Sequence, residues 1–370
     1  MTAPPRRIAL VLASSTGGIG KHVESLVAGL AADGDDVTVY GPAATDQQFG
    51  FARLGAAFVP VEIPAKPQPA DAVAVRAVRR AMSADRPDVI HAHGLRAGFV
   101  AAMGRPRGCP LVVTWHNPVV ATGLRASVYG RLERYVARTA DVTLGASADL
   151  VERARSLGAS DARLAPVAAP ALRAPQRSPG AVHQEFGLSP DEPLILSVGR
   201  LHPQKRYDLL IEAAARWVHR RPRPTVLIAG SGPAYMQLVP RIAAARAPVI
   251  LAGHRTDVAD LLAAADLAVV TSDWEARQLF AQEALTAGVP LVATAVGGVP
   301  DLVGDAAVLI PPGDVDAIDA AVTRLLDDPA ERERYARAAR EQAATWPTET
   351  DTRELVSSVY EELLAARAGR

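Results

Sequence analysis

The feature that most constrains the fold is an alternation of short apolar runs with longer amphipathic stretches, repeated along nearly the whole chain. This alternation favours parallel sheets covered by helices. The chain is therefore predicted to be an α/β protein with two doubly wound, Rossmann-like domains. The predicted strands lie at residues 8–13, 37–40, 89–92, 111–114, 142–144, 194–198, 225–229, 249–251, 267–271, 291–293 and 308–310.

A proline-rich segment divides the alternation into two halves. Residues 165–181 contain four prolines and show little periodicity, which is typical of an interdomain connection. We expect a first domain at 1–170, a linker at 171–182 and a second domain at 183–346. Pro347 separates a final helical segment, 347–370, from the helices before it. A chain of 370 residues is long enough for two such cores.

Composition excludes several classes of protein. Forty basic and forty acidic residues give zero formal net charge, so nothing favours nucleic acid as a partner. The single cysteine, Cys109, excludes an intrachain disulfide and fits a reducing compartment. No stretch approaches the ~20 apolar residues that span a bilayer, and the apolar run at 8–13 is too short for a signal core. We expect a cytoplasmic protein.

Two glutamates, Glu275 and Glu283, follow the predicted strand 267–271. Glu275 falls in the loop at the carboxyl end of that strand, and Glu283 falls on a helix that Gly288 can end. Open α/β sheets bind ligands at this edge, and a carboxylate can accept two hydrogen bonds from a ribose diol. Taken singly, each glutamate is equally well interpreted as a solvated helix carboxylate.

Basic residues follow two other strands of the second half. Arg200 and Lys205 share one loop after strand 194–198, where they could clamp a diphosphate from two sides. Arg255 follows strand 249–251, a weaker signal for contacts with a base. Asp314 and Asp316 have the spacing of a metal-binding pair, but their place at the start of a helix favours capping.

The first half carries a glycine turn and three histidines after strands. Gly17 and Gly18 precede a helix, which suits either a phosphate contact or a plain tight turn. His91 and His93 share a strand face and could bind metal, but no third ligand is near in sequence. We therefore favour one lining a site and the other packing. His116 could orient a sugar hydroxyl or pack in the core.

Taken together, these motifs resemble the family 4 retaining glycosyltransferases of the GT-B fold, over nearly the whole chain. The resemblance implies two Rossmann-like domains facing across a cleft, with the C-terminal helix crossing back to the first domain. The matching pieces occur in the family's order: Gly17-Gly18, Asp88 to His93, Thr114-Trp115-His116, Gly199-Arg200-Leu201 with Lys205, Glu275 with Glu283, Ala287 to Pro290, and Gly297-Gly298.

The resemblance also implies roles for these residues around a nucleotide-diphosphate sugar. Arg200 and Lys205 match the basic pair on the diphosphate, which stabilises the departing nucleotide without a bound metal or other cofactor. Glu283 matches the carboxylate on the ribose. Arg255 lies in the loop beside the base. Gly18, with Gly17 before it, matches the glycine whose backbone nears the phosphates.

The reaction implied by the resemblance is glycosyl transfer with retained anomeric configuration. Glu275 matches the glutamate beside the donor sugar, and His116 matches the first-domain histidine at that sugar. His93 is a candidate on the acceptor side. The leaving phosphate would deprotonate the acceptor hydroxyl on the same face, so the step needs positioning and charge stabilisation above all.

The chain departs from the family pattern in two places. The family usually has Gly-Phe-Gly after the first glutamate, where this chain has Ala276, Arg277 and Gln278, followed by Leu279. Losing glycine at 278 would make a positive φ costly there. We expect Arg277 and Gln278 to lie near the sugar hydroxyls and to influence sugar choice. The family's lysine is often followed by glycine, here Arg206.

The sequence names neither the base, the sugar nor the acceptor. Residues 124–139 form a helical pattern with four arginines among apolar residues. We favour a solvated amphipathic core helix, with a helix resting on an anionic membrane near a lipid-linked acceptor as the alternative. Two other functions stay open: a sugar-nucleotide epimerase on the same fold, and a non-catalytic nucleotide-binding relative.

Overall fold

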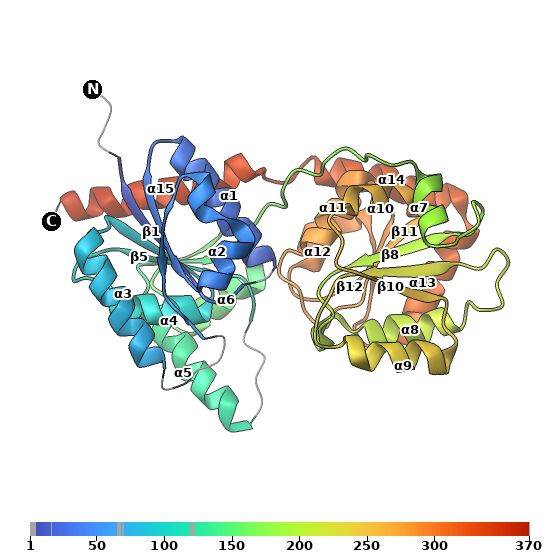
Figure 1. Cartoon of the computed structure of the whole chain (residues 1–370), viewed down its shortest axis with the longest axis horizontal. Coiled ribbons are helices and arrows are strands. Elements are labelled where there is room, and N and C mark those ends of the chain that lie inside the picture. The colour runs from blue at the N-terminus through green and yellow to red at the C-terminus, as the bar shows by residue number, and fades with distance from the viewer. Residues whose placement is uncertain (1–4, 16, 65–67, 69, 119–122, 370) are drawn as a thin grey trace. The chain divides into compact units, whose positions relative to one another are not determined.

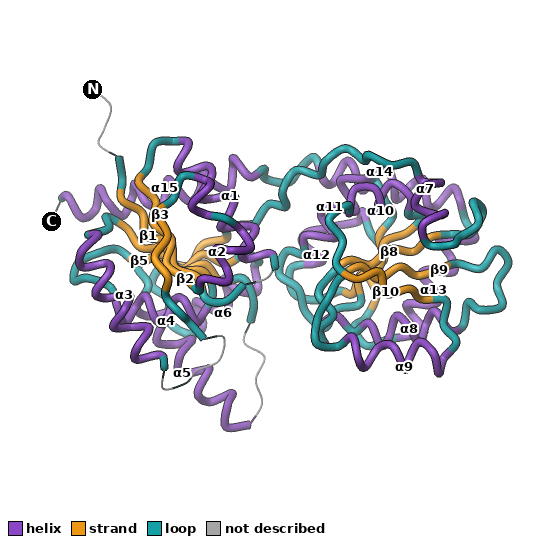
Figure 2. The backbone as a smooth tube through the Cα atoms, viewed as in Figure 1, coloured by secondary structure: helices purple, strands orange, loops and turns teal. Residues whose placement is uncertain are grey.

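The computed structural model describes residues 5–15, 17–64, 68, 70–118 and 123–369. The chain divides into two compact units, the first made of Met1–Pro170 with Pro347–Arg370 and the second of Ala171–Trp346. Each unit holds one sheet with helices on both faces (Figures 1 and 2). All pairings within both sheets are parallel among the described residues, which confirms the predicted α/β fold class.

Unit 1 contains a seven-stranded sheet in the order β3-β2-β1-β4-β5-β6-β7. Its strands are β1 (Arg7–Leu12), β2 (Asp36–Gly41), β3 (Ala57–Pro60), β4 (Val89–His93), β5 (Leu111–Trp115), β6 (Val142–Gly145) and β7 (Ala162–Leu164). Its helices are α1 (Gly18–Ala32), α2 (Ala43–Phe49), η1 (Phe51–Leu54), α3 (Asp71–Asp85), α4 (Leu95–Gly104), α5 (Gly123–Thr139), α6 (Ala148–Ser156) and α15 (Glu349–Ala368).

Unit 2 contains a six-stranded sheet in the order β10-β9-β8-β11-β12-β13. Its strands are β8 (Leu194–Val198), β9 (Thr225–Ala229), β10 (Val249–Gly253), β11 (Leu267–Val270), β12 (Leu291–Thr294) and β13 (Val308–Ile310). Its helices are α7 (Pro179–Glu185), η2 (Pro203–Lys205), α8 (Tyr207–Ala215), α9 (Tyr235–Ala245), α10 (Val258–Ala264), α11 (Leu279–Ala287), α12 (Val299–Val303), η3 (Gly304–Ala306), α13 (Val315–Asp327) and α14 (Pro329–Ala343).

The central strands form where apolar residues run without interruption. After Arg7, every residue of β1 is buried, as expected for a strand covered by helices on both faces. The sequence interpretation missed β3 and β7, which are short edge strands with partly exposed residues. A strand with one neighbour buries less surface, so its apolar signal is weaker.

Two helices of unit 2 begin at residues whose side chains cap them. Helix α7 begins at Pro179, inside the segment interpreted as a linker, because Ser178 caps it by accepting a hydrogen bond from the Ala181 amide. Asp314 likewise accepts from the Ala317 amide and caps α13, so the capping interpretation of this aspartate is confirmed.

Helix α15 belongs to unit 1 although it follows unit 2 in sequence. Thr348 and Asp351 form a capping box that starts the helix directly after Pro347. Its buried face carries Val356, Val359 and Tyr360, which join the core cluster of β1 and α1. The hydroxyl of Tyr360 lies 2.7 Å from Nδ1 of buried His91, so the helix also satisfies a polar group inside the unit.

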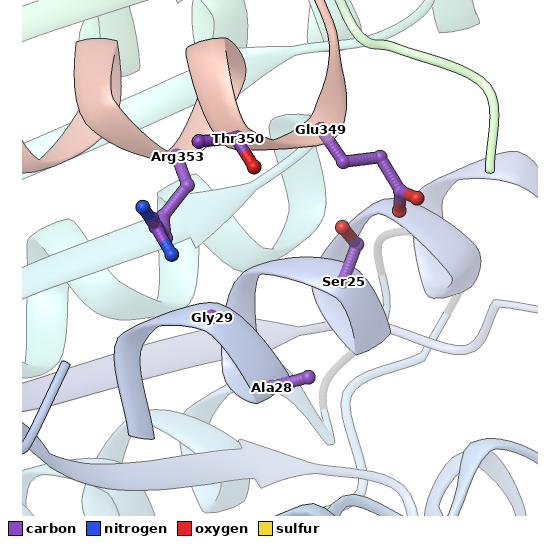
Figure 3. A pocket seen from close by; sticks show the side chains of 6 residues that line it. All are labelled: Ser25, Ala28, Gly29, Glu349, Thr350 and Arg353. Atoms are coloured by element: carbon purple, nitrogen blue, oxygen red, sulfur yellow. The ribbon is translucent and has the colours of Figure 1, made fainter. Parts of the chain in front are cut away.

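Gly29 of α1 leaves room for the Arg353 side chain of α15. A Cβ at this position would lie 2.5 Å from Cδ of Arg353, closer than such atoms pack. Figure 3 shows side chains of both helices around a pocket of about 240 Å³. The same Arg353 forms an ion pair with Asp33 at 3.2 Å, which ties α15 to the end of α1.

We predict that Tyr360→Ala destabilises unit 1 by about 3–5 kcal/mol, because it removes a fully buried ring and leaves Nδ1 of His91 without its partner. Urea denaturation measures the loss of stability, and hydrogen–deuterium exchange of the β1 and β4 amides shows that it falls on unit 1. Tyr235→Ala is the matched control, because Tyr235 is 46% exposed and its loss should cost less than about 0.5 kcal/mol. Equal effects of the two substitutions would contradict the assigned role of α15.

Candidate functional site

The order in which strands are added to the sheet of unit 2 reverses at β8, which pairs with β9 on one side and with β11 on the other. The connections leaving β8 and β11 therefore diverge from the carboxyl edge, and ligands of open α/β sheets bind at such a point. The loop after β8 carries Arg200 and Lys205. The loop after β11 carries Glu275 and leads into α11, which carries Glu283.

Glu275 and Lys205 form a partly buried ion pair at this point. The Nζ of Lys205 lies 2.5 Å from Oε1 of Glu275, and the Ser272 hydroxyl donates to the same oxygen at 2.5 Å. The Lys205 side chain is only 17% exposed and the Glu275 side chain only 10%. Low exposure strengthens their attraction and makes the loss of either partner costly.

Backbone contacts hold the two loops together around this ion pair. The Asp273 amide donates to the Gln204 carbonyl at 2.8 Å, and the Gln204 side chain donates to the Trp274 carbonyl at 2.7 Å. Gly297 follows β12 and lies against the Glu275 backbone, where a Cβ would be 2.1 Å from the carbonyl oxygen. The next amide, Gly298, donates to that carbonyl at 2.9 Å. Glu275 is therefore rigidly positioned.

Arg206 occupies a position where the backbone favours glycine. Its φ of 50° and ψ of 40° place it in the left-handed region, which disfavours residues with a Cβ. The guanidinium pairs with Asp208 at 3.2 Å and with Asp273 at 2.9 Å. These ion pairs offset part of the free energy that the left-handed backbone costs at Arg206. The loop therefore keeps a conformation that usually requires glycine.

Glu283 lies half-buried on α11 and makes no hydrogen bond or ion pair with any described residue. Burial without a partner disfavours the ionised form and raises the pKa of this carboxyl to about 7. A carboxyl group kept without donors inside a protein is unusual, because burial removes its solvation. Glu283 therefore retains the capacity to accept hydrogen bonds from a ligand.

Arg200 and Arg255 have different surroundings. Arg200 is exposed and has no ion pair among the described residues, so its guanidinium is free to meet an anion. Arg255 donates to Asp257 at 2.8 Å and to Glu185 at 2.6 Å, and it lies over the Phe186 ring. The carboxylates occupy the Arg255 guanidinium, so the structure places this side chain in a network that joins α7 to the β10–α10 loop.

The atypical segment after Glu275 is not strained. Gln278 precedes α11 with a φ of −65° in the extended region and makes no side-chain cap hydrogen bond, so the positive φ whose cost we expected at 278 does not occur. The Arg277 guanidinium lies 5.5 Å from the centre of the Trp346 ring, and burial lowers its pKa to about 10. Its Nε and Nη2 atoms and Oε1 of Gln278 are buried without partners. Leu279, the next residue, starts the helix half-buried.

The glycine turn of unit 1 lies at the start of α1. Gly17 precedes the helix without a side-chain cap, and a Cβ there would meet nothing within 4 Å. Thr16, in the same motif, lies outside the described residues. Gly18 is the first helical residue, and the Gly20 amide already donates to the Ser15 hydroxyl at 3.0 Å, so only the remaining amides of this first turn could meet an anion. Both readings of the turn, as a phosphate contact and as a plain turn, remain compatible with this geometry.

His91 shows what a packed histidine looks like in this unit. Its Nδ1 lies 2.7 Å from the Tyr360 hydroxyl and its Nε2 lies 2.6 Å from the Thr114 hydroxyl. Both ring nitrogens therefore have partners in the core. Burial lowers the pKa of His91 to about 3, so the ring is neutral at physiological pH.

His93 and His116 lie together because their strands, β4 and β5, are neighbours in the sheet. Nδ1 of His93 lies 3.3 Å from Nε2 of His116, and both rings are buried. His22, on α1, lies close to both, with ring centres 5.4 Å and 5.3 Å away. Sequence reasoning missed His22 because its partners are 71 and 94 residues away, as the residue numbers show.

No helix among the described residues is long and apolar enough to span a bilayer. Helix α5 exposes Arg131, Arg134 and Val128 while it buries Val136 and Ala137. This pattern agrees with the amphipathic core helix that we favoured.

Comparison with known proteins agrees with this geometry. Residues 181–342 match the family described as Glycosyl transferases group 1, and residues 17–170 match the Glycosyl transferase 4-like domain. A glycogen synthase of Mycobacterium tuberculosis is 31% identical over 95% of this chain and 92% of its own length. Sucrose-phosphate synthase of Thermosynechococcus elongatus superposes with a TM-score of 0.81 at 22% identity, over 98% of this chain and all of that one.

Anabaena HepE, solved in complex with UDP-glucose, gives a TM-score of 0.80 at 19% identity, over 96% of this chain and 99% of that one. These solved structures show the fold, and the family matches and the mycobacterial relative show the family. The chain therefore belongs to the group 1 glycosyltransferases, family 4 of the GT-B fold, and it is a glycosyltransferase.

Proposed function

We propose that this enzyme moves a sugar from a nucleotide-diphosphate sugar to an acceptor hydroxyl, with retention of configuration and without a required metal. The observation that carries the proposal is the arrangement at the β8–β11 edge. The loop after β8 carries Lys205 and exposed Arg200, the loop after β11 carries Glu275 in a partly buried pair with Lys205, and the next helix, α11, carries Glu283 without a described partner. The related fold of HepE, which was solved with UDP-glucose, supports this donor class.

The donor would lie with its diphosphate between Arg200 and Lys205. Arg200 would supply an unpaired positive charge at the departing diphosphate, and Lys205 would donate to it from N–H groups other than the one bonded to Glu275, which together would supply the charge stabilisation that a metal provides in other transferases. Glu283 would accept hydrogen bonds from the ribose diol, which gives its buried carboxyl the donors it lacks. Because Arg255 is paired with carboxylates, we assign the base to backbone groups of the β10–α10 loop instead of its side chain.

The transfer step follows from these positions. The bond between the sugar C1 and the diphosphate oxygen breaks, while a bond from C1 to the acceptor oxygen forms on the same face. The acceptor proton passes to the departing phosphate. Glu275, held by Lys205 and Ser272, would stabilise positive charge at the sugar. His116 is neutral because burial lowers its pKa, so it can accept a hydrogen bond from a sugar hydroxyl.

The acceptor is the least constrained partner. His93, beside His116 in unit 1, is our candidate on the acceptor side. The exposed arginines of α5, next to exposed Val128, are compatible with an acceptor carried in an anionic membrane. We keep a lipid-linked acceptor as the alternative to a water-soluble one.

A thermal-shift screen with UDP, GDP, ADP and their sugars tests the donor site. We expect one nucleotide series to stabilise the protein, and Glu283→Ala to weaken its binding by about tenfold or more, because two hydrogen bonds to the Glu283 carboxyl group are lost. Glu333→Ala is the matched control, since Glu333 is exposed on α14 of the same unit.

Mass spectrometry of the stabilising donor, with and without candidate acceptors, then identifies the reaction. A transferred or slowly hydrolysed sugar supports the transferase. An isomerised donor would indicate the epimerase, and binding without turnover would indicate a non-catalytic relative. If no nucleotide stabilises the protein, the donor site is wrongly assigned.

The protonation of Glu283 predicts a pH dependence of stability. The pKa of Glu283 in the folded protein, about 7, exceeds the ordinary value of 4.5. The protonated carboxyl therefore contributes to the free energy of unfolding fully below pH 4.5, and this contribution is lost as the pH rises through 7. Glu283→Gln should therefore gain stability over the wild type between pH 5 and pH 8, by at most about 3 kcal/mol. Urea denaturation at both pH values measures the gain, and a pH-independent difference would refute the assignment.

The atypical Arg277 and Gln278 predict an altered donor preference. Both keep buried polar atoms without partners, and they directly follow the residue that we place beside the sugar. Replacing both with glycine should change the ratio of kcat/KM values between two donor sugars by at least tenfold, because hydrogen bonds to sugar hydroxyls are lost. Competition assays with paired donors measure this ratio, and an unchanged ratio counts against the role.

A further inference from the structure

Three buried histidines of unit 1 converge from separate elements. His22 comes from α1, His93 ends β4 and His116 follows β5. Each ring offers one nitrogen such that the three nitrogens lie within 4.8 Å of one another. A search of the described residues for three or more His, Cys, Asp or Glu side chains close enough to share a metal ion finds this group of three.

The pair His93–His116 already has a spacing that suits a metal. Their facing nitrogens are 3.3 Å apart. Two nitrogens of a tetrahedral zinc ion, each about 2.0–2.1 Å from the metal, are separated by about 3.4 Å. The His22 nitrogen lies within 4.8 Å of the other two, so His22 would have to move inward to complete such a site.

Packing alone does not account for these rings. His91, next to them, has a hydroxyl partner for each nitrogen, as a buried imidazole should. In contrast, Nε2 of His93 is buried without a partner. His22 makes no hydrogen bond with any described residue, although it is only 6% exposed. His93 Nδ1 and His116 Nε2 are hydrogen-bond partners of each other, so the buried nitrogen that the described residues leave unsatisfied in this cluster is Nε2 of His93.

The chemistry of the cluster selects a class of ion. All three candidate ligands are imidazoles, which suit Zn²⁺, Co²⁺, Ni²⁺ or Cu²⁺, whereas Mg²⁺ and Ca²⁺ require oxygen ligands. No carboxylate belongs to the group, so the fourth position and the balancing charge fall to solvent or a small anion. The unpartnered Nε2 of His93 means that an outer hydrogen bond is missing, which lowers metal affinity. Binding should therefore be reversible.

We propose that His22, His93 and His116 bind one transition-metal dication of the zinc class, and that this ion reversibly inhibits the enzyme. The inhibition rests on the proposed function, because His116 is the residue that we place at the donor sugar. A metal on its nitrogen would occupy the lone pair that the sugar hydroxyl needs. The transfer itself requires no metal, so the ion acts as a regulator.

Metal binding can be measured without any assay of transfer. Co²⁺ titration of the full chain should produce the visible absorption of a tetrahedral site, and calorimetry with Zn²⁺ should give one ion per chain. His22→Gln should weaken both by at least tenfold. His219→Gln is the matched control, because His219 is exposed in unit 2, and it should bind like the wild type. Mg²⁺ should neither bind nor compete.

Several results would overturn the proposal. They are the absence of one-to-one Co²⁺ binding in the wild type, equal binding by His22→Gln, and an anomalous zinc peak away from the three rings in a zinc-soaked crystal. If His22→Gln does not fold, Co²⁺ binding by His116→Gln and the position of the anomalous zinc peak in the wild type test the proposal in its place.

Activity is the second readout. Zn²⁺ should inhibit sugar transfer at the concentration that fills the site, a chelator should restore it, and His22→Gln should stay active. If the protein binds metal but transfers no sugar, the metal site stands and the proposed function fails. If it transfers sugar and Zn²⁺ binds without inhibiting, the regulatory role is refuted.

Discussion

The parallel pairing of β8 with both β9 and β11 is the constraint on which the functional part of unit 2 depends. It brings the loops after β8 and β11 side by side, although Lys205 and Glu275 are 70 residues apart. Once adjacent, their charges must pair, because neither side chain reaches enough water to remain solvated alone. The paired loops then fix the start of α11 and the position of Glu283.

Unit 1 applies the same rule to different chemistry. Neighbouring strands β4 and β5 end at one edge, so His93 and His116 meet there, and His22 of α1 joins them. Helix α15 contributes to this region from the other end of the chain, since its Tyr360 satisfies His91. His91 therefore has a partner for both ring nitrogens, whereas Nε2 of His93 is buried without one. The difference between packing and binding histidines is thus set by their neighbours.

The two departures from the family pattern have opposite structural outcomes. Arg206 adopts the left-handed backbone that glycine would supply, and ion pairs with Asp208 and Asp273 compensate it. Gln278 adopts an ordinary extended backbone, so its side chain adds no strain. A sequence comparison treats both as lost glycines. The backbone shows that only the first keeps the glycine conformation, while the second position can vary in side chain and so in specificity.

The sequence by itself determined the α/β class, the central strands, and the placement of Glu275, Glu283, Lys205 and His116 after strands, because hydrophobic periodicity and turn residues are local signals. It missed edge strands β3 and β7, where local burial is weak. Only the tertiary structure decided which charges meet. It paired Lys205 with Glu275, engaged Arg255 elsewhere and left Glu283 alone. It also joined His22 to His93 and His116, because strand order and helix packing are long-range and leave no trace in residue spacing.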